Sequence, residues 1–165
     1  QASYVGQVAP DEAAGRCALL YLAGQAGLAL DGSDVEGLRA FIAAGGTILA
    51  DSSPTDPGKA FAGIVHDLAT RLDCPLEEAE PGSLLLSAPH LFAAPPPGCT
   101  AGEVLAGDGL VFTSGAYGGA LDGGPPGRPL DRAQMRAVLE MVCNIALAAH
   151  RRQRHVAYAA HRRAP

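Results

Sequence analysis

Apolar residues follow one another without interruption over residues 17–23 and stop at Gly24. A short, continuously apolar run is typical of a strand that is buried on both faces, as strands in parallel sheets are. Residues 47–50 also favour a strand and end in the polar turn 51–54. These two segments predict the first two strands of the domain.

Between these strands, apolar residues return at helical spacing. Ser33 with Glu36 three residues later is a capping-box pattern, and the paired glycines at 45 and 46 are a stop signal, so we expect a helix over residues 34–44. A second helical stripe follows the second strand and ends before Pro75; it consists of Phe61, Ile64, Val65, Leu68 and Leu72.

Residues 76–100 hold five of the 13 prolines, and within them only residues 84–86 favour a strand. We therefore expect an irregular excursion across the edge of the sheet. Residues 103–106 and 110–113 flank Gly107-Asp108-Gly109, and glycine tolerates the positive φ of a tight turn. This pattern predicts an antiparallel hairpin that joins the sheet.

Residues 115–127 contain six glycines, which predicts little regular structure and makes the segment a candidate lid. Asp131 then caps a long helix, whose apolar stripe is Met135, Val138, Leu139, Val142, Ile145, Ala146 and Ala149. Alternating strands and helices predict an α/β fold. We expect a flavodoxin-like three-layer sandwich with a mostly parallel sheet and one antiparallel hairpin.

Composition supports a single domain over residues 1–165, because 48% of the positions are hydrophobic and can form a core. The apolar runs are much shorter than the roughly 18 residues of a membrane span, so we expect none. The four cysteines are isolated and lack histidines at zinc-ligand spacing, which predicts neither a metal site nor another cofactor. Reduced thiols would suit a cytoplasmic protein.

The formal net charge of −5 conceals a basic C-terminal tail over residues 150–165. Such a tail can attract nucleic acid, anionic lipid or an acidic partner. Cations near a helix C-terminus are also favoured by the helix dipole, and we prefer this interpretation of a solvated helix end. We expect no specific nucleic-acid binding, because the chain has only four Phe, four Tyr and no Trp.

Polar residues follow the predicted strands at the edge where open α/β sheets bind ligands. Gln25 comes after the first strand, and Ser114 comes after the hairpin. Asp51, Ser52 and Ser53 come after the second strand. We expect these five residues to converge on a ligand-binding site, although residues 51–53 could instead only shape a turn and cap the next helix.

Catalytic motifs are absent from the sequence, and we predict no catalytic residues. A nucleophile elbow needs Ser or Cys between glycines, and Ser114 comes closest but lacks the upstream glycine. Residues 57–60 depart from the phosphate-loop pattern, because Ser53 stands at the first glycine position and Ala60 at the hydroxyl position. The sequence contains no His-Glu-x-x-His motif for a metal.

Residues 20–25 read Leu-Tyr-Leu-Ala-Gly-Gln, and residues 38–52 combine a Gly-Gly helix stop with a strand that ends in Ala-Asp-Ser. These two blocks resemble an uncharacterised bacterial family, domain-of-unknown-function family 4159. Residues 87–92 and Asn144-Ile145 also fall at the expected places. The resemblance covers roughly residues 18–149. It implies the fold of the class I glutamine amidotransferase-like superfamily.

The chain departs from this family in two respects. Gln25 stands where the family usually has histidine, which removes a candidate for acid–base chemistry. A strand–helix unit generally precedes the first motif, whereas only residues 1–16 precede it here. Either residues 3–8 are a remnant edge strand, or the chain is a fragment without that unit. The amidotransferase cysteine elbow is missing, so the resemblance does not imply glutamine hydrolysis.

The leading hypothesis is a non-catalytic domain that binds a small-molecule ligand or a protein partner. The alternative is a hydrolase in which Ser114 or Ser52 is the nucleophile, with Asp51 and a histidine from elsewhere in the chain. A third hypothesis is salt-sensitive binding of the basic tail to an anionic surface. Exposed apolar faces on the excursion would also support a homodimer.

Overall fold

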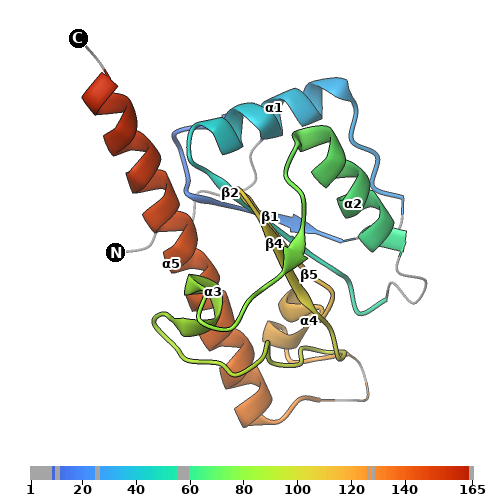
Figure 1. Ribbon diagram of the computed structural model, residues 1–165. Helices are drawn as coiled ribbons and strands as arrows, with labels where there is room; N and C mark the ends of the chain where they lie inside the picture. Colours follow the sequence, from blue (N-terminus) through green and yellow to red (C-terminus); the bar gives the residue numbers. More distant parts are fainter. Residues whose placement is uncertain are drawn as a thin grey trace.

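The computed structural model describes residues 9, 12–24, 27–55, 60–125, 127 and 129–163 (Figure 1). In chain order the elements are β1 (Leu19–Ala23), α1 (Gly32–Ala43), β2 (Thr47–Asp51), α2 (Ala60–Leu72), β3 (Glu77–Glu78), α3 (Leu84–Ser87), β4 (Val104–Gly107), β5 (Leu110–Thr113), α4 (Tyr117–Leu121) and α5 (Arg132–Arg163).

The described strands form an open five-stranded sheet in the order β1-β2-β5-β4-β3. β2 pairs in parallel with β1 and β5, whereas β4 pairs antiparallel with β5 and β3. The predicted hairpin is present, with Asp108 and Gly109 as its turn. The prediction of a mostly parallel sheet is wrong. The reversed strand β4 lies inside the sheet, so both of its pairs are antiparallel and the sheet is mixed.

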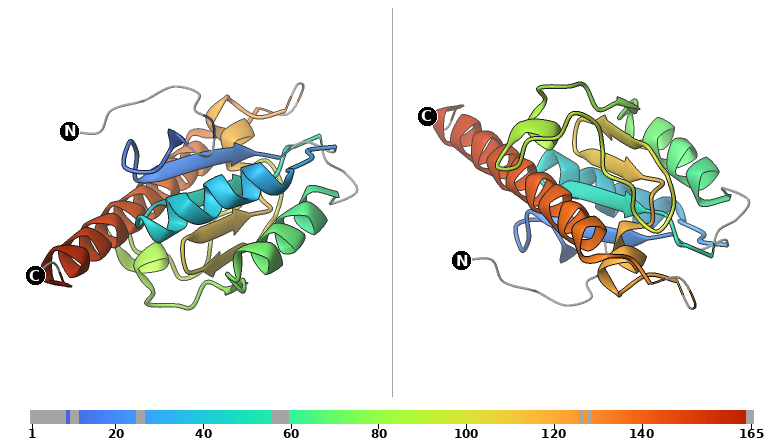
Figure 2. Two further views of the ribbon diagram at one scale, coloured as in Figure 1. Left: turned by 90° about the horizontal axis from the view of Figure 1, so that it is seen from above. Right: turned by 90° about the horizontal axis from the view of Figure 1, so that it is seen from below.

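Helices cover both faces of this sheet (Figure 2). Ile48 and Ala50 of β2 pack into a core beneath α1 and α2, whereas Leu49 faces a second core that includes residues of α3, α4 and α5. This alternation follows from the two-residue period of a strand. All five residues of β2 are buried, as expected for a strand inside the sheet. β1 lies at the sheet edge and is only partly buried, contrary to the prediction from its apolar run.

Two element predictions near the helices need correction. α1 begins at Gly32, and its capping box is formed by Asp31 and Asp34 instead of Ser33 and Glu36. Residues 84–86 form part of the short helix α3 and not a strand. Leu85 and Leu86 are both buried in the core beside α5, which a helical turn permits. In a strand, these two neighbours would point to opposite faces.

Asn144 holds the proline-rich excursion against α5. Its side chain is fully buried, and its Oδ1 accepts the backbone N–H of His90 at 2.9 Å. Its Nδ2 donates to the carbonyl oxygens of Leu85 at 2.9 Å and His90 at 2.7 Å. These hydrogen bonds satisfy both ends of the amide. A polar residue in the middle of an apolar helical stripe therefore has a structural role.

The long helix α5 crosses one face of the sheet, and its C-terminal turns continue past α1 (Figure 1). Arg152 fixes this part of the helix. Its Nε donates to Asp108 Oδ1 at 2.8 Å, and its Nη1 donates to the carbonyl oxygens of Ile42 and Gly46, each at 2.9 Å. No helix in the described part of the chain has the length and apolar character needed to cross a membrane.

Replacing Arg152→Met should lower the free energy of unfolding by about 1–3 kcal/mol, because the buried carbonyl groups of Ile42 and Gly46 lose their charged donor. Arg132, at the other end of α5, is exposed and is a matched control; Arg132→Met should change stability by less than about 0.5 kcal/mol. Urea unfolding followed by circular dichroism measures both values. Equal unfolding midpoints for the two variants would contradict the assigned role of Arg152.

Candidate functional site

The last residue of β2, Asp51, is 1% exposed, and its carboxylate accepts four hydrogen bonds. Oδ1 accepts from the hydroxyl of Thr113 and, at 3.0 Å, from the backbone N–H of Tyr117. Oδ2 accepts from the hydroxyl of Tyr21 at 2.9 Å and from the N–H of Gly118 at 2.7 Å. The carboxylate therefore joins β1, β2, β5 and the first residues of α4. About four lone-pair positions are available, so its accepting capacity is filled.

The turn between β5 and α4 brings those N–H groups to Asp51. Ala116 lies in the left-handed region, with φ 55° and ψ 59°, and it is 1% exposed. A Cβ on Gly118 would stand 2.2 Å from the Tyr21 hydroxyl oxygen, and one on Gly119 would stand 2.5 Å from Cγ of Pro54. These glycines permit close packing, which is why a helix forms where the glycine content predicted irregular structure. That prediction is wrong for residues 117–121.

The electrostatic field near Asp51 is negative. Burial, followed by the charge of Asp51 and the hydrogen bond to it, raises the pKa of Tyr21 above its usual value. Burial and then Asp51 also raise the pKa of Tyr117. Burial raises the pKa of the Cys99 thiol, and Asp51 and Asp122 add to the effect. All three side chains therefore remain protonated near neutral pH.

A cleft of about 770 Å³ opens beside Asp51, at the carboxyl ends of β1 and β2. Its polar lining is contributed by Tyr21, Asp51, Ser52, Ser53, Thr55, Tyr117 and Asp122. Its apolar lining includes Leu19 and Leu49 from the strands, Leu121 from α4 and Val142 from α5. The volume is within the range of small-molecule sites, which combine an apolar wall with a few polar groups.

The structure brings Asp51, Ser52 and Ser53 together in this cleft, but Ser114 is not among the residues that line it. The hydroxyl of Ser114 accepts the N–H of Glu103 at 2.9 Å, and its carbonyl accepts from the hydroxyl of Thr100. Ser114 therefore fastens the segment before β4. Gln25 lies outside the described residues.

The two adjacent serines have different roles in the turn. Ser53 Oγ lies 2.8 Å from Thr55 Oγ1 and accepts the N–H of Thr55 at 3.2 Å. This side chain therefore shapes the turn, in agreement with the alternative interpretation of residues 51–53 as turn residues. The N–H of Ser52 donates to the carbonyl of Thr113 at 2.9 Å. Within the described residues, no hydrogen bond involves the Ser52 hydroxyl. Among the described residues of the turn, this hydroxyl is therefore a polar group that remains available to a ligand.

Several polar residues of the cleft are missing from the sequence-based candidates, among them Tyr21, Tyr117 and Asp122. Tyr21 lies within an apolar run, where its hydroxyl gives no sign of a partner 30 residues away. Tyr117 and Asp122 belong to a glycine-rich segment that predicted no regular structure. Their positions depend on α4, and α4 depends on Asp51. Sequence spacing alone carries no signal for this tertiary arrangement.

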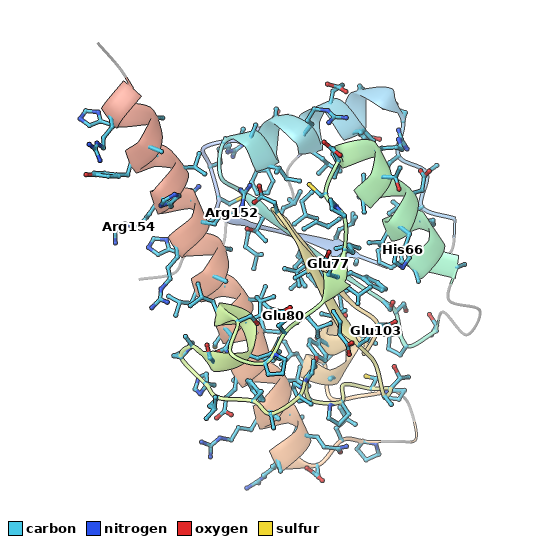
Figure 3. All side chains as sticks on the ribbon, in the orientation of Figure 1. His66, Glu77, Glu80, Glu103, Arg152 and Arg154 are labelled. Atoms are coloured by element: carbon cyan, nitrogen blue, oxygen red, sulfur yellow. The ribbon has the colours of Figure 1, made fainter. Side chains whose placement is uncertain are left out.

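No described histidine lines the cleft, and no cluster of metal-ligating side chains occurs within the described ranges. His66 lies on α2, and its ring makes an edge-type contact with the ring of Phe112, with the two ring centroids 6.4 Å apart (Figure 3).

Comparisons with protein-family models and with curated protein sequences give no match to this chain.

The Asp51→Asn variant should unfold with a free energy about 1–3 kcal/mol lower than that of the unsubstituted chain. The amide has one accepting atom, so a buried N–H of Tyr117 or Gly118 would face an NH₂ group. Asp122→Asn is the control, because Asp122 is an exposed aspartate in the same cleft and should change stability by less than about 0.5 kcal/mol. Chemical denaturation measures the free energy of unfolding of both variants. Similar decreases in the two variants would refute the role of Asp51 in anchoring the start of α4.

Proposed function

We propose that this chain is a non-catalytic domain that binds a small molecule in the cleft beside Asp51. The observation that carries the proposal is the form of the cleft: about 770 Å³, with an apolar wall and a polar rim at the carboxyl ends of two parallel strands. Ligands of open α/β sheets occupy this position.

The state of the polar groups favours binding over catalysis. A general base needs a free lone pair within reach of a substrate proton. All four accepting positions of Asp51 are taken, and the Tyr21 hydroxyl is committed to Asp51 as a donor. At the sharp β5–α4 turn, the left-handed residue is Ala116, whose methyl group offers no nucleophile. These side chains hold a binding surface in shape.

The charged residues that line the cleft restrict the charge of the ligand it can bind. The described lining of the cleft includes two aspartates and no Lys, Arg or His. A phosphate or carboxylate group would enter without a cation and against a negative field. The same surroundings suit a hydroxyl or an ammonium group attached to an apolar body. We therefore propose a neutral or cationic ligand.

The relationship to the flavodoxin-like and class I glutamine amidotransferase-like folds, and to domain family 4159, also remains a proposal. It is supported by the parallel set β1-β2-β5, by α1 and α2 on one face, and by α5 on the other. Residues 47–52 of the quoted motif form β2 and place Asp51 at its end. The antiparallel pairs of β4 with β3 and β5 depart from the mostly parallel sheet that this relationship implies.

Val142 and Leu139 offer a matched pair of substitutions on α5, because Val142 lines the cleft and Leu139 does not. We expect Val142→Trp to fill the apolar wall and to weaken ligand binding by at least about tenfold, or about 1.4 kcal/mol, whereas Leu139→Trp should have little effect. A fragment library with neutral, cationic and anionic members, screened by amide chemical shifts of the ¹⁵N-labelled chain, supplies the ligands.

In that screen, the shifted amides should cluster at residues 52–55 and 117–119, and anionic fragments should be the poorest binders. Both variants should first show wild-type melting behaviour. Hits that map elsewhere, or that bind Val142→Trp as well as the unsubstituted chain, would refute the cleft as the binding site. A preference for anions would refute only the proposed ligand class.

The hydrolase alternative retains one supporting observation, the Ser52 hydroxyl in the cleft. A fluorophosphonate probe reacts with serines that a neighbouring base activates. We expect no labelling of Ser52 or Ser114, because no described histidine forms a hydrogen bond with either hydroxyl. Peptide mass spectrometry after incubation measures this. Labelling that disappears in Ser52→Ala would establish the hydrolase and overturn the non-catalytic proposal.

A further inference from the structure

Charge is separated along this chain to an unusual degree. All 17 acidic residues lie at or before Glu140, whereas residues 150–163 contain five arginines, three histidines and no acidic residue. These last residues are helical and continue α5 past α1 (Figure 1). The predicted solvated helix end is therefore part of a rigid, projecting element.

The exposed side of this helical segment is predominantly basic. At 100° per residue, seven exposed side chains fall within an arc of about 140°. They are His150, Arg151, Arg154, His155, Tyr158, His161 and Arg162, and we call them the basic face. The opposite side packs on the domain, where the side-chain amide of Gln153 donates to the carbonyl of Cys17 at 3.1 Å. Arg152 also lies on this inner side.

The basic face has no anionic partner among the residues that the structure describes. Among the described ion pairs, none includes a residue of this face; the one arginine of the segment in such a pair is Arg152, with Asp108. The interaction found within the face is Arg162 over the ring of Tyr158, 6.0 Å from its centroid. Like charges on neighbouring turns repel one another. An external anionic surface would relieve this repulsion.

An acidic surface of complementary charge lies at the β3 edge of the sheet, which is opposite the β1 edge. Glu77 and Glu78 form β3, and the N–H of Ala79 donates to the carbonyl of Val104, which places Glu80 near Glu103. All four glutamates are exposed, and none belongs to an ion pair among the described residues. We call these four the acidic edge. Figure 3 shows Glu77, Glu80 and Glu103 around β3, and Arg154 apart from them on α5.

From this charge complementarity, we infer that a second copy of this chain occupies the basic face, by presenting its acidic edge. The contact is reciprocal if the basic face of the second copy meets the acidic edge of the first, and such a pair closes as a two-fold dimer. The segment from residue 150 to residue 162 is about 18 Å long, so several side chains can engage at once.

Other polyanions fit these surfaces less well. Nucleic acid would approach a domain whose remaining surface is acidic and would be repelled by it. A helix that lies in a membrane interface needs large apolar side chains on its exposed side, and Tyr158 is the only large one on the basic face. A second copy satisfies the acidic edge and the basic face together.

Charge reversal on each surface tests this inference with the full chain. Arg151→Glu with Arg154→Glu reverses the basic face, and Glu77→Arg with Glu80→Arg reverses the acidic edge. Sedimentation velocity over a concentration series should show dimers of the unsubstituted chain at about 50 mM NaCl and at least tenfold weaker association at about 500 mM, where screening is strong. Each reversed variant alone should be monomeric.

An equimolar mixture of the two reversed variants is the decisive sample, because each then meets a surface of opposite charge. We expect the mixture to form dimers again at low salt. Arg16→Glu with Arg132→Glu is the control, since it makes the same change in net charge outside the basic face and should leave association intact. Melting curves verify that every variant is folded.

Several results would overturn the inference. These are a monomeric unsubstituted chain at every concentration in low salt, dimers that persist in both reversed variants, and a mixture that stays monomeric. Duplex DNA and vesicles with about 30% phosphatidylserine are tested in parallel. If either binds the unsubstituted chain more tightly than the chain binds itself, and Arg151→Glu with Arg154→Glu abolishes that binding, the partner is that polyanion and not a second copy.

Discussion

The carboxylate of Asp51 is the constraint on which the rest of the cleft depends. It is buried at the end of β2, a strand inside the sheet, and four donors from β1, β5 and α4 converge on it. A buried carboxylate is costly unless such hydrogen bonds replace its water. The geometry of four segments is thereby fixed at one point. Without this residue, the turn at Ala116 and the two N–H groups at the start of α4 would have no common partner.

This arrangement also determines what the cleft can do. Because Asp51 is saturated by its own chain, the polar groups that can reach a ligand are those around it, such as the hydroxyl of Ser52 and the carboxylate of Asp122. The negative charge of Asp51 nevertheless acts on its surroundings, because after burial it is the next cause that raises the pKa values of Tyr21, Tyr117 and Cys99. One residue thus supplies rigidity and, in the proposed function, the negative field that disfavours an anionic ligand.

Local patterns predicted the elements whose formation depends on local physics. The stripe of α2, the turn at Asp108-Gly109 and the strand before Asp51 follow from side-chain period and turn chemistry. The failures share a tertiary cause. α4 forms in a glycine-rich segment because Gly118 must approach Tyr21, and α3 forms because Leu85 and Leu86 both enter a core beside α5. Of the cleft residues, the sequence-based candidates include Asp51, Ser52 and Ser53, whereas Tyr21 and Asp122 reach the cleft through packing that no spacing encodes.

The distribution of charge is a constraint of a different kind. The sequence shows that the C-terminal residues are basic, but only the fold shows where their side chains lie relative to the acidic residues. A basic tail in an extended chain could fold back over the acidic body. As a continuous helix it projects past α1, and Arg152 and Gln153 lock its inner side to the domain. The remaining arginines are therefore held away from the glutamates at β3. Because the helix holds these charges apart, their attraction can be satisfied only between molecules, and this is the basis of the inferred association of two copies.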